Sequence, residues 1–175
     1  MFSLSYTSAY DPYHTVFRYL VLLNSAEGAW LPYRSARVAD FFLCFPWALQ
    51  DVKAPRDVKG FARHRNSLVK DYTPSSYERV PNDRVVFERM EVIHAAAVSA
   101  LAGAKMIEAN DLQNEEIILN RDAISERMQE AIDLFTETHA SLVDFLSTKL
   151  PQIDERGKDG IFARTRLGDY SYDIV

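Results

Sequence analysis

The chain has 175 residues, of which 47% are apolar and 26% are charged, as in a single folded globular domain. Its net charge of −5 argues against a protein that coats nucleic acid through bulk electrostatics, although it allows a local basic patch. The one cysteine, Cys44, cannot form an intrachain disulfide and is expected to be a small buried hydrophobe. Because the chain shows neither a membrane-spanning apolar run nor a secretory signal pattern, we expect a soluble cytoplasmic protein.

The first predicted element is a helix from about Pro12 to Ala26. Asp11 is a favoured N-cap, because its carboxylate accepts a hydrogen bond from a free backbone N–H, and proline suits the first helical position. Apolar side chains then recur at helical spacing: Tyr13, Val16, Phe17, Leu20 and Leu23. A second helix is predicted to begin near Ser35 and to end at Pro46, with an apolar face of Val38, Phe41, Phe42 and Phe45.

The helical pattern disappears from residue 51 to residue 82, where the segment holds three prolines and one glycine. We predict a long loop here, of a kind that tends to be functional. Its first part, residues 51–70, is basic, with six lysines or arginines against two aspartates. These six residues form a candidate nucleic-acid or partner patch: Lys53, Arg56, Lys59, Arg63, Arg65 and Lys70.

The second half of the chain predicts a third helix, a hairpin and a fourth, longer helix. The third helix begins near Asn82 and ends at Gly103, with small residues in its second half. The runs 105–109 and 115–120 flank five polar residues, which favours a β-hairpin. The segment 121–150 contains neither Gly nor Pro and predicts one long helix, in which Thr138-His139 is the one candidate for a break.

Three helices followed by a hairpin is the layout of a winged-helix domain, with the third helix in the recognition position and the hairpin as the wing. The predicted fold class is therefore mainly α with a small β-hairpin (α+β), namely a winged-helix-like domain plus a long C-terminal helix. We divide the chain into a winged-helix-like domain, residues 1–120 with the basic loop 51–82, and a long helix with a C-terminal tail, residues 121–175.

The sequence contains no convincing catalytic, cofactor-binding or metal-binding motif. The four histidines lack ligand spacing, and two of them, His94 and His139, fall at apolar helical positions that are typical of hydrogen-bonded core residues. No nucleophile elbow and no phosphate-binding frame occurs. We therefore predict that the protein is not an enzyme, needs no cofactor or metal, and works by binding other macromolecules.

Charge is distributed unevenly along the chain. The segment 108–144 has ten carboxylates against two arginines, opposite in sign to the basic segment 51–70. The basic segment is expected to meet the protein's own acidic helix, an acidic partner or a phosphate backbone. A long amphipathic helix together with ten phenylalanines and nine tyrosines is typical of an obligate subunit.

Two segments carry a family resemblance. Residues 10–23 open with Tyr-Asp-Pro-Tyr-His, and residues 37–46 read Arg-Val-Ala-Asp-Phe-Phe-Leu-Cys-Phe-Pro. This pairing resembles the middle components of bacterial ABC-three-component systems, the group that includes Lamassu-type anti-phage defence. The resemblance covers residues 1–50 well and the remainder in layout.

The resemblance implies a small noncatalytic subunit of an antiviral defence complex, encoded beside an SMC-like or Rad50-like ATPase and an effector nuclease. Such an adaptor bridges its two partners through protein–protein contacts and is associated with DNA indirectly, without a membrane. The alternative is a free-standing winged-helix DNA-binding transcriptional regulator that dimerises through residues 121–150. Its recognition helix would be a poor complement for phosphates, because Glu88 and Glu91 lie beside the two arginines Arg84 and Arg89.

Overall fold

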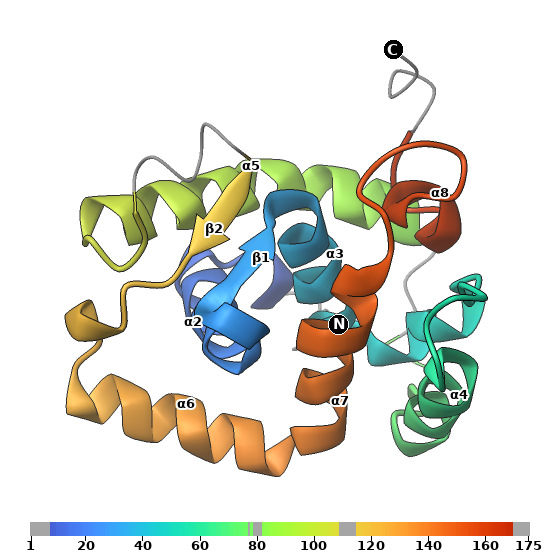
Figure 1. The fold of residues 1–175 in the computed structure, drawn as a ribbon, viewed down its shortest axis with the longest axis horizontal. Coiled ribbons are helices and arrows are strands. Elements are labelled where there is room, and N and C mark those ends of the chain that lie inside the picture. Colours follow the sequence, from blue (N-terminus) through green and yellow to red (C-terminus); the bar gives the residue numbers. More distant parts are fainter. Residues whose placement is uncertain (1–7, 77, 79–81, 109–114, 170–175) are drawn as a thin grey trace.

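The computed structural model describes residues 8–76, 78, 82–108 and 115–169 (Figure 1). Three helices form the centre of the molecule: α2 (Pro12–Ser25), α3 (Tyr33–Cys44) and α5 (Asp83–Gly103). Helix α2 packs against both of the others and also against α6 (Glu126–Thr138). As a result, its residues 19–23 are completely buried. Asp11 caps α2 as predicted, since its Oδ1 accepts the backbone N–H of Tyr13 at 2.8 Å.

A small antiparallel sheet closes one side of this helical core. Strand β1 (Trp30–Pro32) pairs with β2 (Glu116–Ile118), and Leu31 lies opposite Ile117. The residue that follows β2, Leu119, forms an antiparallel bridge with Ile107, so the segment before the turn lies alongside the segment after it. The backbone N–H of residue 120 also donates to the carbonyl of residue 106 at 2.8 Å. The predicted pairing of 105–109 with 115–120 is confirmed as a single bridge between Ile107 and Leu119, while residues 109–114 lie outside the described residues.

If α4 is set aside as an insertion, the main elements follow in the order α2, β1, α3, α5, the bridge residue Ile107 and β2. The predicted class, mainly α with a small antiparallel sheet, is confirmed. Strand β1 joins the sheet between the first two helices, a pairing that the sequence did not reveal. The winged-helix layout stays a prediction, in which α5 is the helix at the recognition position.

The predicted loop 51–82 is wrong in its middle part, where the structure has helix α4 (Phe61–Asp71). Gly60 precedes the helix with a φ of +73°, a left-handed conformation that glycine adopts without strain. Phe61 and Leu68 are the two buried anchors of α4, and most of its other side chains are exposed. Because α4 buries so few apolar side chains, its sequence lacks a clear helical pattern of apolar residues and looks like that of a solvent-exposed loop.

The structure does not contain one continuous helix over residues 121–150. The helix is interrupted at Thr138-His139, the position where the sequence allowed a break. Helix α6 ends at Thr138, His139 leaves the helical conformation with φ −119° and ψ 32°, and α7 (Ala140–Asp144) begins in a new direction (Figure 1). A π-helical turn over Phe145–Lys149 follows. The bend is held by the Tyr72 hydroxyl, 3.0 Å from Nδ1 of His139.

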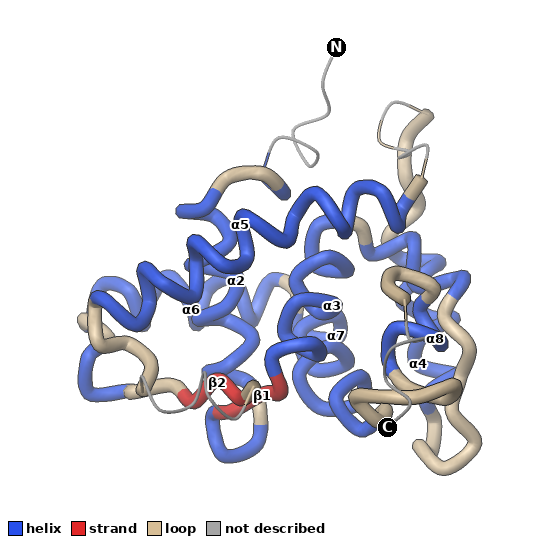
Figure 2. Tube along the Cα trace, turned by 90° about the horizontal axis from the view of Figure 1, so that it is seen from above, coloured by secondary structure: helices blue, strands red, loops and turns tan. Residues whose placement is uncertain are grey.

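The bend allows both α6 and α7 to pack against α2. The division of the chain into 1–120 and 121–175 stays a prediction. The short helix α8 (Ile161–Thr165) packs on α3, and the views in Figures 1 and 2 both place α4 and α8 at one end of the molecule and α6 at the other. Within the described ranges, no helix combines the length and the apolar character needed to cross a membrane.

Candidate interaction surfaces

The three central helices are joined by a buried polar network. Arg18 of α2 donates from Nε to Asp40 Oδ1 at 2.6 Å, and a second guanidinium nitrogen lies 3.1 Å from Oδ2. Nε2 of His94, on α5, lies 3.0 Å from the same Oδ2. Asp40 on α3 and His94 are both fully buried, and Arg18 is 7% exposed. One carboxylate therefore connects all three helices.

The network fixes the ionisation of its members. Burial alone would raise the pKa of Asp40, but the charge of Arg18 and hydrogen bonds from His94 and Arg18 hold that pKa below its usual value. Burial lowers the pKa of His94 and outweighs the opposing effect of Asp40. Neutral His94 donates from Nε2 to Asp40, which leaves Nδ1 to accept from Arg37 Nε at 3.3 Å. The predicted role of His94 as a hydrogen-bonded core residue is confirmed.

The residues most suited to catalysis or metal binding are held in structural roles. Cys44 is buried as expected, and burial raises the pKa of its thiol, which disfavours the nucleophilic thiolate. His139 supports the bend between α6 and α7. Among the described residues, no group of three or more His, Cys, Asp or Glu side chains is arranged to hold a metal ion.

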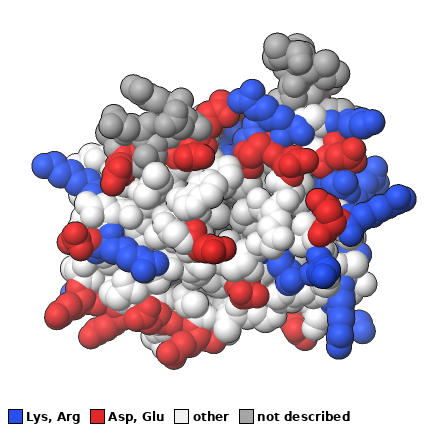
Figure 3. Space-filling view, in the orientation of Figure 1, with Lys and Arg blue, Asp and Glu red and all other residues white. Residues whose placement is uncertain are grey.

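The structure separates the six residues of the predicted basic patch. Lys59 precedes α4, and Arg63 and Lys70 lie on the exposed face of that helix, at a spacing that brings them to one side. Lys149 adds to this surface, because its Nζ donates to the carbonyl of Lys59 at 3.0 Å. We call these four residues the basic α4 surface; basic side chains gather over this end of the molecule in Figure 3.

Of the other three residues of the predicted patch, Arg65 is the one held by side-chain hydrogen bonds among the described residues. Arg65 is turned back toward the chain, where it donates to the carbonyl of Val52 and to Asn66. Arg56 lines a separate hollow together with Asp57, Asp154 and Asp159. Lys53 is exposed and is fixed through its backbone N–H, which donates to the carbonyl of Arg164 at 2.9 Å.

Helix α6 carries the opposite charge at the other end of the molecule. Four of its carboxylates are exposed, and acidic side chains line this lower edge in Figure 3: Glu126, Glu130, Asp133 and Glu137. In the part of the chain that the structure describes, no ion pair joins α6 to the basic α4 surface. The basic segment does meet the second half of the predicted helix 121–150, since Nε2 of His64 lies 2.9 Å from Oγ of Ser141, but the acidic side chains of α6 and the basic α4 surface are exposed to solvent.

The exposed face of α5 is neither basic nor strongly polar. Arg84 is engaged by Glu88 of the same helix at 2.8 Å, and the exposed Arg89 and Glu91 carry opposite charges. Val92 is 74% exposed, and the turns that follow it expose alanines and a serine. A helix that reads the DNA major groove needs cationic and hydrogen-bonding side chains at these positions, so this face suits protein contact better.

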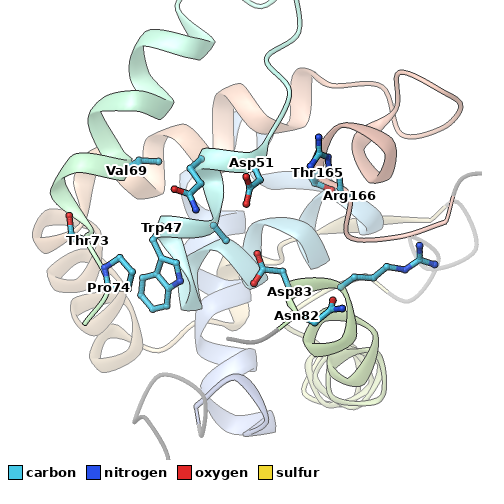
Figure 4. Close-up of a pocket in the computed structure, with 12 residues that line it drawn as sticks. Trp47, Asp51, Val69, Thr73, Pro74, Asn82, Asp83, Thr165 and Arg166 are labelled. Atoms are coloured by element: carbon cyan, nitrogen blue, oxygen red, sulfur yellow. The ribbon is translucent and has the colours of Figure 1, made fainter. Parts of the chain in front are cut away.

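Sequence reasoning missed a cavity of about 580 Å³ at the end of the molecule that holds α4 and α8 (Figure 4). Its lining comes from residues 47–51, the end of α4, the start of α5 and residues 165–166. Trp47 forms one wall, and the carboxylates of Asp51 and Asp83 point into the space between these segments. No spacing in the sequence relates these four segments, so only the fold could bring them together.

Comparison with known proteins decides the family. A family model described as "ABC-three component (ABC-3C) system Middle Component 5" matches residues 4–173. The chain belongs to this family. The description places an ABC-3C Middle Component 5 protein in a system of three components, so partners within that system are implied. No curated protein and no solved structure matches the chain.

Proposed function

We propose that this ABC-3C middle component is a noncatalytic adaptor that bridges an SMC-like or Rad50-like ATPase and an effector nuclease in a Lamassu-type, cytoplasmic anti-phage defence complex. The family assignment supports a role among partners of one system. The proposal adds the identity of those partners and the bridging role. DNA is contacted through the assembly and not by this chain alone.

The face of α5 is the observation that supports this proposal most strongly. Helix α5 exposes two arginines and two glutamates in its first half and Val92, alanines and a serine in its second half, a poor complement for a phosphate backbone. The same features favour a protein surface, because small side chains let another chain approach closely and exposed apolar area is buried on association. A free-standing transcriptional regulator is correspondingly less supported.

The two charged ends of the molecule support the bridging role. The basic α4 surface and the acidic face of α6 carry opposite charges, and no ion pair joins them among the described residues, although the C-terminal ends of the two helices meet at Tyr72 and His139. Two partners with complementary charge would be attracted to different ends of the adaptor. We assign the basic α4 surface to an acidic surface of one partner.

Co-expression with the two proteins encoded on either side tests the proposal. The chain should purify in a stable assembly with both neighbours, and light scattering should give a mass that accounts for all three. A chain that purifies alone as a monomer or homodimer would contradict the adaptor role. Specific DNA shifted in a gel by this chain alone would instead favour the regulator.

A further inference from the structure

The cavity at Trp47 has the features of a binding site and lies outside the surfaces assigned above. It combines an aromatic wall, Trp47, with the apolar side chains of Val69 and Pro74 and with two carboxylates that approach from different segments (Figure 4). Its volume of about 580 Å³ lies in the range of ligand sites, and its lining combines apolar walls with several polar side chains.

The two carboxylates in this cavity are left without a compensating charge. Burial raises the pKa of Asp83, and the nearby negative charge of Asp51 raises it further. Among the described residues, neither carboxylate has an ion pair or a side-chain hydrogen bond. Two like charges held in one hollow repel each other, and a cation placed between them would remove that repulsion.

The basic side chains at the rim do not supply that cation. Arg84 is held by Glu88 of the same helix, whose carboxylate lies 2.8 Å from its Nε. Arg166 is exposed on the side opposite Trp47, and no ion pair joins it to Asp51 or Asp83 within the described ranges. The space between the indole and the two carboxylates is therefore open to a group from outside the chain.

We propose that this cavity receives an arginine side chain of a partner subunit, with its guanidinium stacked on Trp47 and paired to Asp51 and Asp83. An arginine fits this set of groups because its planar cation stacks on aromatic faces and offers several donors to carboxylates at once. A lysine has a compact charge that stacks less well, and a neutral side chain would leave the carboxylates repelling each other. The identity of the partner rests on the proposed function, but the chemistry of the cavity does not.

A titration of the isolated full chain tests the chemistry of the cavity. Replacing the only other tryptophan, Trp30→Phe, makes Trp47 the sole indole reporter. N-acetyl-arginine amide should change the Trp47 fluorescence saturably, and the isosteric but neutral N-acetyl-citrulline amide should bind at least tenfold more weakly. Asp51→Asn combined with Asp83→Asn should weaken the arginine probe at least tenfold, whereas Asp122→Asn on the exposed surface should leave it unchanged.

Two results of this titration would overturn the proposal: equal binding of the two probes, or equal binding of the arginine probe to the parent and to the Asp51/Asp83 double variant. Circular dichroism shows whether the double variant is folded. If the double variant is not folded, the single variant Asp51→Asn, at an exposed residue, is used in its place. It should raise the logarithm of the dissociation constant of the arginine probe by about half as much as expected for the double variant.

The co-expressed assembly tests the source of the arginine. The Asp51/Asp83 double variant should weaken partner association at least tenfold relative to Asp122→Asn. If a stable assembly forms and the double variant leaves its affinity unchanged, no partner arginine occupies the cavity and the proposal fails. If no assembly forms at all, the adaptor role fails, while the probe titration still decides whether the cavity selects a guanidinium.

Discussion

Two carboxylates, Asp40 in the helical core and Asp83 in the cavity, show opposite relations between burial and charge. Asp40 is completely buried, yet its pKa is lowered because Arg18 and His94 satisfy both of its oxygens. Asp83 is only partly buried, yet its pKa is raised because no cation compensates the cost of burial or the charge of Asp51. The presence or absence of a charged partner, and not the extent of burial, decides the direction in which each carboxylate's pKa is shifted.

This difference separates a structural site from a candidate binding site. The core network is satisfied on every side and joins α2, α3 and α5, so its charges hold the fold together. The cavity leaves two charges unbalanced at the surface, at a small cost in stability. Natural proteins tolerate such local conflicts mainly where function requires them. Variants of the two sites should therefore shift stability in opposite directions.

Asp40→Ala should have the largest effect, because it leaves the buried guanidinium of Arg18 without its counter-ion. Removing one partner of a buried ion pair costs about 3–5 kcal/mol, a large part of the stability of a domain of this size. Urea denaturation at pH 7 measures the change. Asp122→Ala, at an exposed carboxylate, is the matched control and should shift the free energy of unfolding by less than about 0.5 kcal/mol. A loss below about 1 kcal/mol for Asp40→Ala would mean that the network contributes little.

The pH dependence of stability tests the other end of the same network. The pKa of His94 is lowered in the folded state. At a pH below the ordinary histidine pKa of about 6.5, His94 is therefore protonated in the unfolded chain but stays neutral in the folded chain. Stability should therefore be full above that pH and should fall as the pH decreases through it toward the folded-state pKa. Denaturation midpoints between pH 8 and pH 5 measure this slope. His94→Gln should lower stability at pH 7 and flatten the slope; an unchanged slope would assign the pH dependence to other groups.

Asp51→Asn should have a smaller effect of the opposite sign. It removes a like charge from beside Asp83, so we expect a gain of about a few tenths of a kcal/mol, the scale of charge interactions at exposed sites. The pKa of Asp83 should fall in the variant, which carboxyl NMR titration would detect. A variant that is less stable than the parent, with an unchanged pKa at Asp83, would show that the two carboxylates do not interact.

Removing charge from the basic α4 surface should have the smallest effect on stability. Arg63→Ala with Lys70→Ala is expected to change the free energy of unfolding by less than about 0.5 kcal/mol, since both side chains are exposed. The same double variant should slow association with the acidic partner at low salt and match the parent at high salt, because the attraction is screened. Arg127→Ala, on α6, is the control, and an equal effect from it would contradict the role of the α4 surface.

Local signals in the sequence predicted most of the central fold. Asp11-Pro12 marks the start of α2, Asn82 caps α5 through its side chain, and the runs on either side of 110–114 pair as expected. In each case the determinant lies within a few residues of the element it specifies. The break at His139 was also visible as an interruption of the apolar stripe, although its direction depends on packing against α2.

The elements that sequence reasoning missed depend on distant contacts. Helix α4 has only Phe61 and Leu68 as fully buried side chains, and Phe61 packs on Phe145, far along the chain. Strand β1 is three residues long and exists through its pairing with β2. The candidate cavity draws on four segments, so the relation of Asp51 to Asp83 has no spacing to detect.

The bridging role is tested most directly by asking whether the two flanking gene products associate without this chain. All three proteins are co-expressed, the neighbour that carries the ATPase is captured, and the recovered effector is quantified with and without the adaptor. The account predicts that the effector is recovered with the adaptor and is lost without it. An effector that binds the ATPase equally well in its absence would contradict the claim that this middle component connects the two.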